Sequence, residues 1–146
     1  AKSLLHEFDR YDMVRAAVYD NYKLDVSDVE FNLPKPNYTI HTLVHLREKF
    51  PDKQFKVIIG EDNLEGFTRW KNYEIILEHY GLYVYPRPGA KPSTLATHAQ
   101  VRFVDAPLLD ISATFIRSCI RHNQSIRYLV PDAVEQMIVA KKYYLA

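Results

Sequence analysis

The chain has a single cysteine, Cys119, among its 146 residues. One thiol excludes a disulfide within the chain and a metal centre built from several thiolates. Because disulfides stabilise many small secreted domains, the lone cysteine favours a reducing, cytoplasmic setting. Cys119 lies within a predicted helix, where we expect it to be a small core residue.

Long apolar runs and an excess of one charge are also lacking. No stretch approaches the 18 or so apolar residues that a membrane helix requires, so we expect no membrane span. The first residues, AKSLLHEFDRYD, have no apolar segment of the kind found in secretory signal peptides, so we expect no signal peptide. The net charge is +1, whereas nucleic-acid-binding domains usually carry a strong basic excess. We therefore expect no nucleic-acid partner.

The hydrophobic periodicity predicts helices that alternate with short strands in a single domain, residues 1–146. Helices are expected over residues 5–20, 39–50, a stretch after Gly60 to about residue 80, 112–123 and 131–143. Strands are expected over residues 24–29, 57–60 and 101–104 and within LYVYPRPG (82–89). The first two helices would bury one face each, formed by Phe8, Tyr11, Val14, Ala17 and Val18 and by Ile40, Leu43, Val44 and Arg47. Asn37 or Thr39 would cap the second helix, and Pro131 would be the first residue of the last one.

Strands that alternate with helices imply an α/β fold with a parallel sheet covered on both sides. The apolar run Val57-Ile58-Ile59 suits a strand buried on both faces. Ligands of such folds bind beyond the carboxyl ends of the strands. We therefore expect the loop after Gly60, the RPG turn and the DISATFIR segment to share one rim of the sheet.

The segment DISATFIR, residues 110–117, has two interpretations. A helix that begins at Ser112 would present free backbone N–H groups, and Thr114 and Arg117 would add donors suited to phosphate oxygens. Alternatively, Ser112 only caps the helix and Arg117 is a surface residue. Local spacing by itself favours the capping interpretation.

The segment IIGEDNLEGFTRW, residues 58–70, is the second candidate. Gly60 at a strand end permits the close approach of a ligand, Asp62 is suited to accept hydrogen bonds from ribose hydroxyls, and Trp70 could stack on a flat ring. The alternative is that Asp62 caps the next helix and Trp70 belongs to the core.

Other polar residues are weaker candidates. Thr39 in PNYT is more easily explained as part of a helix cap, and Arg87 in the RPG turn as a solvated side chain. His41 and His45 are four residues apart on a predicted helix, but no third ligand is apparent, so we expect no metal site.

Taken together, PNYTIHTL, KFPDKQFKVIIGEDNLEGFTRWKNYEIIL, the RPG turn, ISATFIR and YLVPDAVEQMI resemble the bacterial nicotinate mononucleotide adenylyltransferases, in the family's order and over nearly the whole chain. ISATFIR by itself resembles the phosphate-binding signature of the wider nucleotidyltransferase superfamily. IIGED, the tryptophan of RW and the upstream PNYT point to the pyridine-nucleotide branch. The resemblance implies a Rossmann-like, doubly wound parallel sheet.

The resemblance also implies roles for individual residues. Ser112, Thr114 and Arg117 would hold the ATP triphosphate, with Arg117 as the catalytic residue. The adenosine would contact Gly60, Asp62 and Ile111. The mononucleotide would contact Thr39, Trp70, Lys71 and Arg87, and Lys71 stands where the family usually has an aromatic residue. Mg²⁺ would accompany ATP, and a homo-oligomer is compatible with this family.

One family motif has no counterpart in the sequence. The family opens with a strand and a GxFxPxHxGH loop, so we expect the chain to lack the first βαβ portion of the fold and to be a fragment of low stability and negligible turnover by itself. Two alternatives remain at this stage. One is another nucleotidyltransferase that uses nicotinamide mononucleotide or phosphopantetheine as acceptor, and the other is a non-catalytic nucleotide-binding module.

Overall fold

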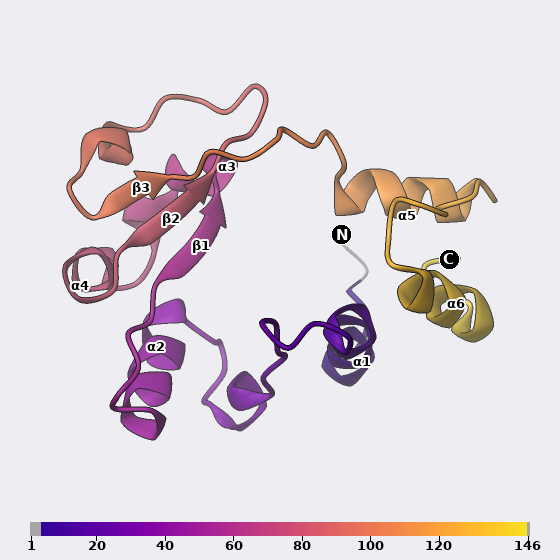
Figure 1. Cartoon of the computed structure of the whole chain (residues 1–146), viewed down its shortest axis with the longest axis horizontal. Helices are drawn as coiled ribbons and strands as arrows, with labels where there is room; N and C mark the ends of the chain where they lie inside the picture. The colour runs from indigo at the N-terminus through magenta and orange to yellow at the C-terminus, as the bar shows by residue number, and fades with distance from the viewer. Residues whose placement is uncertain (1–3, 146) are drawn as a thin grey trace. The chain divides into compact units, whose positions relative to one another are not determined.

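The computed structural model describes residues 4–145 (Figure 1). Its helices are α1 (Glu7–Val18), α2 (Thr39–Lys49), α3 (Glu61–Leu64), α4 (Tyr73–His79), α5 (Ala113–Arg121) and α6 (Asp132–Lys141). Its strands are β1 (Val57–Gly60), β2 (Leu82–Tyr85) and β3 (Val101–Phe103). Three short 3-10 helices are η1 (Val29–Asn32), η2 (Phe67–Arg69) and η3 (Thr94–Thr97).

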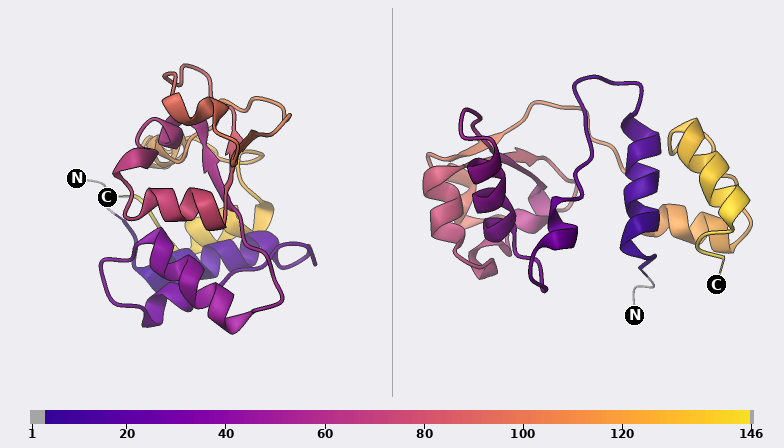
Figure 2. Two further views of the ribbon diagram at one scale, coloured as in Figure 1. Left: turned by 90° about the vertical axis from the view of Figure 1, so that its left-hand side faces the viewer. Right: turned by 90° about the horizontal axis from the view of Figure 1, so that it is seen from below.

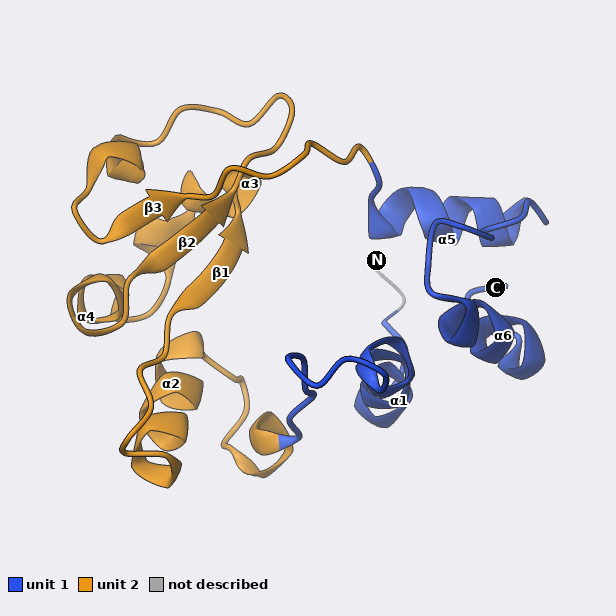
Figure 3. Ribbon diagram, in the orientation of Figure 1, with its two compact units in different colours: residues 1–28, 111–146 blue, residues 29–110 orange. Residues whose placement is uncertain are grey.

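The chain forms two compact units, which Figure 3 distinguishes by colour. Unit 1 comprises residues 1–28 and 111–146, and unit 2 comprises Val29–Asp110. The single domain predicted over residues 1–146 stays a prediction, and each unit is described by itself.

Unit 2 contains a parallel sheet in the order β1-β2-β3, which confirms the predicted α/β class. The register pairs Val57 with Leu82 and Gly60 with Tyr85, so β1 and β2 end at the same level. The residues that follow these two strands therefore emerge next to each other.

The core of unit 2 lies on one face of the sheet. Alternate residues of the strands, including Ile59, Leu82 and Val84, are buried with Ile40 and Leu43 of α2 and with residues of α3, η2 and α4. Ile58 points to the other face and is 75% exposed, so the prediction of a strand buried on both faces is wrong at this residue.

The inner face predicted for α2 is half correct. Ile40 and Leu43 are buried, but Val44 is 42% exposed and Arg47 is exposed as well. The core contacts α2 along a narrow stripe, which leaves the two later positions at its margin.

The strand predicted over residues 24–29 does not form. The segment is irregular up to η1, and the backbone N–H of Val26 donates to the side chain of Asp25 at 2.8 Å. Short acidic side chains compete in this way with the backbone ladder of a strand. Leu24, which a buried strand would cover, is 54% exposed.

Unit 1 is helical, and Figure 2 shows α1 and α6 side by side. Its core contains Cys119, Ile120, Ile126, Val134, Ile138 and Tyr143, packed against Leu5, Met13 and Ala17 from the region of α1. The predicted stripe of α1 is therefore wrong at Phe8 and Val14, which are 57% and 46% exposed. The region of α1 packs against α6 through Leu5, Met13 and Ala17. Asp9 also accepts a hydrogen bond from the Tyr143 hydroxyl at 2.7 Å.

Two helix starts differ slightly from the predictions. The residue before α2 is Tyr38, and no side chain caps the helix; Asn37 instead donates from Nδ2 to the carbonyl of Glu30 at 3.3 Å. Pro131, predicted as the first residue of the last helix, is instead the cap residue before α6, which begins at Asp132.

Candidate active site

The ends of β1 and β2 bring three predicted residues together. Gly60 is the last residue of β1, Asp62 lies in α3 directly after it, and Arg87 follows β2 by two residues. The Arg87 Nε lies 3.7 Å from Asp62 Oδ1. A methyl group on Gly60 would collide with the Asp62 carboxylate and lie 3.3 Å from Arg87 Nε, so a side chain at position 60 would displace Asp62 from its place beside Arg87.

The guanidinium of Arg87 has N–H donors that remain available to a ligand. Its Nε is buried and has no hydrogen-bond partner among the residues that the structure describes, although the whole side chain is 39% exposed. An ion pair this open to water contributes at most about 1 kcal/mol. Arg87 can therefore leave Asp62, or keep it, and still donate to an anionic ligand.

Glu61 is a contact that sequence reasoning missed. Its Oε2 accepts a hydrogen bond from the backbone N–H of Arg87 at 3.1 Å. The only signal in the sequence was the position of Glu61 directly after the strand end, and spacing does not reveal which loop lies opposite.

Residues around Trp70 and the start of α2 form a second group. The Trp70 ring packs against Phe67 with 4.9 Å between centroids and an interplanar angle of 45°, and it is half-buried. Lys71 Nζ lies 4.6 Å from the centroid of the Tyr38 ring. Tyr38 is the residue directly before Thr39 in the sequence. The structure therefore brings Lys71 next to the uncapped start of α2, and Trp70 is both a partner of the core and accessible on its remaining surface.

In unit 1, the start of α5 gathers the residues predicted to hold phosphate. Ser112 is the cap residue, and its Oγ accepts from the backbone N–H of Phe115 at 3.1 Å. Arg117 Nη2 donates to Thr114 Oγ1 at 3.4 Å. Ser112 and Thr114 are exposed, as is Ile111 just before them.

The structure confirms that Ser112 caps α5, and this cap does not exclude a second role for the residue. The Ser112 oxygen accepts one hydrogen bond as a cap, so its O–H remains a donor, beside the backbone N–H groups of the first turn. These donors and Arg117 are suited to oxygen atoms of a polyphosphate.

The remaining polar candidates are also placed. Cys119 is buried and not in a disulfide, as predicted. Across residues 4–145, no three or more His, Cys, Asp or Glu side chains are arranged to hold a metal ion. Within the same range, no helix has the length and hydropathy needed to cross a membrane.

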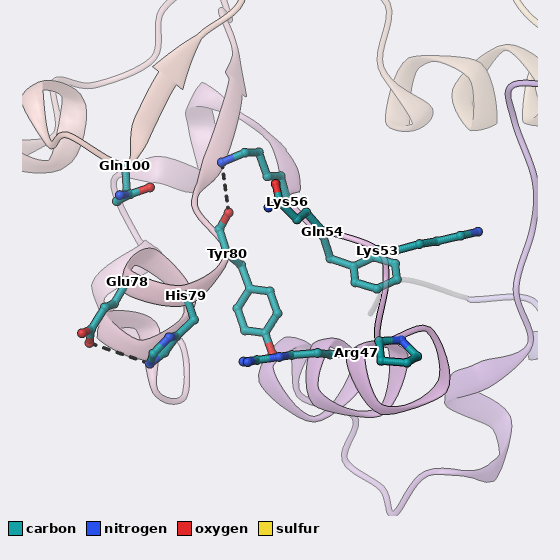
Figure 4. Close-up of a pocket in the computed structure, with 10 residues that line it drawn as sticks. Arg47, Lys53, Gln54, Lys56, Glu78, His79, Tyr80 and Gln100 are labelled. Carbon is teal, nitrogen blue, oxygen red and sulfur yellow. Dashed lines mark hydrogen bonds and ion pairs between the residues drawn. The ribbon is translucent and has the colours of Figure 1, made fainter.

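A basic cavity of about 380 Å³ lies at the other end of the sheet (Figure 4). Its lining includes Arg47, Lys53, Lys56 and Tyr80, and the Lys56 amine donates to the Tyr80 carbonyl at 3.3 Å. Lys56 precedes β1 and Tyr80 precedes β2, so the cavity lies at the amino ends of the strands. None of the predicted site residues lines it.

Comparison with known proteins places the chain in a family. Residues 1–119 match the family model described as cytidylyltransferase-like. A probable nicotinate-nucleotide adenylyltransferase of Cytophaga hutchinsonii is 57% identical over 143 residues, which cover 98% of this chain and 74% of the relative. The corresponding protein of Flavobacterium johnsoniae is 43% identical over 97% of this chain and 75% of the relative.

Solved structures agree on the fold. A Plasmodium falciparum nicotinic acid mononucleotide adenylyltransferase superposes with a TM-score of 0.76 at 17% identity, covering 98% of this chain and 76% of that one. A putative nicotinate-nucleotide adenylyltransferase of Vibrio parahaemolyticus gives a TM-score of 0.74 at 20% identity, over 99% and 75% of the two chains. The likeness at these identities concerns the fold, and the closer relatives supply the family. The chain belongs to the nicotinate-nucleotide adenylyltransferases.

Proposed function

We propose that the protein transfers the adenylyl group of ATP to nicotinate mononucleotide, giving nicotinate adenine dinucleotide and pyrophosphate in NAD biosynthesis. The 57% identical relative named for this activity supports the proposal. So does a solved protein of the same fold, complexed with NaAD. The observation that carries it is the grouping of Gly60, Asp62 and Arg87 where β1 and β2 end.

The reaction is an in-line displacement at phosphorus. A phosphate oxygen of the mononucleotide attacks the α-phosphorus of ATP, and the bond from that phosphorus to the oxygen bridging the β-phosphate breaks. Pyrophosphate takes the electron pair of the broken bond and leaves. No covalent nucleophile is required, so the protein contributes positioning and the stabilisation of negative charge.

The triphosphate would bind at the start of α5. Ser112 and Thr114 would donate hydroxyl hydrogen bonds, and the free N–H groups of the first turn would add donors that carry partial positive charge. Arg117 would stabilise the charge that develops as pyrophosphate leaves, which makes it the catalytic residue. Mg²⁺ would enter as the ATP complex, because it is commonly bound through substrate phosphates.

Most of the residues that the resemblance assigns to the two nucleoside groups belong to unit 2, and Ile111 belongs to unit 1. Asp62 would accept hydrogen bonds from the adenosine ribose, with Gly60 and Ile111 in contact with the same nucleoside. Trp70 would stack on the pyridine ring, and the backbone N–H groups of Thr39 and Lys71 would donate to its carboxylate. Arg87 would donate to the phosphate of the mononucleotide.

We further propose that the protein works in the cytoplasm without a nucleic-acid partner, and that it is able to form homo-oligomers. A reducing compartment suits the free thiol of Cys119, and a net charge of +1 gives little attraction to nucleic acid.

The test compares acceptors. The purified full-length protein would be incubated with Mg²⁺ and ATP and with nicotinate mononucleotide, nicotinamide mononucleotide or phosphopantetheine, and pyrophosphate release would be measured. We expect the highest kcat/KM with nicotinate mononucleotide. A preference for phosphopantetheine, or no turnover with any acceptor, would refute the proposal.

A further inference from the structure

The hydrogen bond between Glu61 and Arg87 extends the contact between two strands beyond their ends. Backbone pairing of β1 with β2 stops at Gly60 and Tyr85. Glu61 is the first residue of α3, is half-buried, and accepts from the Arg87 N–H at 3.1 Å. A side chain thus connects the segment after β1 to the turn after β2.

This turn has few other means of attachment. Arg87 stands between Pro86 and Pro88, and proline has no backbone N–H. The N–H of Arg87 is therefore the only backbone donor of residues 86–88, and Glu61 accepts its hydrogen bond. Because the acceptor is a carboxylate, the bond is charge-assisted and stronger than one between neutral groups.

The bond leaves the guanidinium of Arg87 available. Glu61 engages the backbone of Arg87, whereas Asp62 faces its side chain, with 3.7 Å between Oδ1 and Nε. The backbone of the turn is fixed by one carboxylate while the donors of the side chain remain directed to the strand end above Gly60.

We propose that Glu61 is a positioning residue for Arg87. The inference rests on the proposed function, in which Arg87 binds the phosphate of the mononucleotide. By fixing the turn before the substrate arrives, Glu61 reduces the ordering that binding would otherwise require. Glu61 is assigned no contact with a substrate, and it would act through the backbone of Arg87.

The test separates the reach of the Glu61 side chain from its charge. Glu61→Gln keeps an acceptor oxygen at the same reach and loses the charge, whereas Glu61→Asp keeps the charge and is one methylene shorter. We expect Glu61→Asp and Glu61→Ala to raise the KM for nicotinate mononucleotide about tenfold, as the loss of a hydrogen bond to a charged group would. Glu61→Gln keeps the hydrogen bond without its charge, so it should raise this KM less than Glu61→Asp does. The KM for ATP should change little in all three.

Two further variants show whether Glu61 acts through Arg87. The effect of Glu61→Ala should disappear in the Arg87→Ala background, because residues that act as a unit are not additive. Glu65→Ala is the matched control: Glu65 is a nearby carboxylate that pairs with Lys91 at 3.8 Å, and its loss should leave the KM unchanged. Melting temperatures would show that each variant is folded, and Glu61→Asp still reports on reach where Glu61→Ala does not fold.

The outcomes distinguish the two proposals. A wild-type protein without adenylyl transfer to nicotinate mononucleotide would refute the proposed function and the positioning role with it. An active wild type with a normal KM in Glu61→Asp, or with additive effects of Glu61→Ala and Arg87→Ala, would refute the positioning role only.

Discussion

At the scale of single residues, Arg117 and Trp70 combine structural contacts with chemistry that a ligand can use. Arg117 donates to Thr114 at 3.4 Å, a long hydrogen bond that directs its side chain toward the start of α5 without using all five N–H donors. Trp70 packs on Phe67 and keeps accessible surface. Each residue can therefore be tested by a substitution that preserves part of its structure.

Arg117→Ala should lower kcat/KM by roughly 10²–10³-fold, the usual effect of removing one donor to developing negative charge. Arg121→Ala, in the last turn of the same helix and exposed, is the matched control and should retain near-normal activity. Steady-state kinetics of both variants would check the prediction. Near-normal kcat/KM in Arg117→Ala would exclude the catalytic role.

Trp70 is the only tryptophan of the chain, so intrinsic fluorescence reports on it alone. If the pyridine ring stacks on the indole, nicotinate mononucleotide should quench the emission in a saturable way. ATP, which we assign to other residues, should quench far less. Equal quenching by both ligands would contradict the assignment.

The contact made by Lys71 could not be predicted from its residue type. The resemblance implied a contact through the backbone at this position, where the family usually has an aromatic residue. The structure places the Lys71 amine 4.6 Å from the centroid of the Tyr38 ring, on the loop that leads into α2. Sequence alone could not predict this pair, because the two residues are 33 positions apart and meet only through the packing of unit 2.

At the scale of elements, the start of α5 joins helix stability to ligand binding. Ser112 caps the helix, and replacement of such a cap by alanine costs about 1 kcal/mol. The same hydroxyl is assigned to the triphosphate. Two substitutions separate these roles.

Ser112→Ala should lower both the melting temperature and the affinity for ATP. Ser112→Asp should retain the cap, and hence the melting temperature, but raise the KM for ATP by at least tenfold because its carboxylate repels phosphate. Thermal unfolding and kinetics of the two variants provide the measurement. If Ser112→Asp binds ATP normally, the hydroxyl serves only as a cap.

The contact of α1 with the region after α6 makes the stability of the protein depend on pH. The Tyr143 hydroxyl donates to Asp9, and this hydrogen bond together with burial raises the pKa of Tyr143 above its usual value near 10, although Lys141 opposes the shift. A raised pKa means that the folded state holds the proton more tightly than the unfolded state. The contribution to stability is therefore complete below pH 10 and is lost as the pH rises through the folded pKa.

Tyr143→Phe should consequently lower the melting temperature by a few degrees at neutral pH. The difference from the wild type should shrink at alkaline pH, because the hydrogen bond to Asp9 no longer contributes there. Thermal unfolding between pH 7 and pH 11 would measure this difference. A constant difference across that range would show that the phenol does not titrate against Asp9.

Contacts between distant segments explain part of the corrections to the predicted elements. Apolar residues of α1 occur on more than one face, so the 3.6-residue period does not distinguish Phe8 and Val14, which are exposed, from Met13, which packs in the core together with the correctly predicted Ala17. Only the contact with α6 decides which of these residues are covered. Likewise, residues 24–29 have the composition of a strand but find no partner strand.

At the scale of the whole molecule, the predicted ligand contacts come from both units. The residues proposed to bind the ATP triphosphate belong to unit 1, and most of the residues proposed to contact the nucleosides and the mononucleotide belong to unit 2. Binding of each substrate can be followed through the stability of the full-length protein, because a ligand that binds only the folded state stabilises it.

Saturation with Mg²⁺ and ATP at 100 times the Kd should add about 2.7 kcal/mol to the free energy of unfolding. The shift should be smaller in Arg117→Ala at the same ATP concentration and unchanged in Arg121→Ala. Calorimetry or a thermal-shift assay would measure it. An equal shift in wild type and Arg117→Ala would show that Arg117 does not contact bound ATP.

The sequence by itself determined most of the helices, the three strands of the parallel sheet, the cap at Ser112 and the family. These features depend on local periodicity, on side chains within one helical turn and on motifs that are contiguous in the chain. Only the tertiary structure decided which faces are buried, that Ile58 is exposed, and that Glu61 meets Arg87. Those outcomes depend on which distant segments pack together, and neither periodicity nor spacing contains that information.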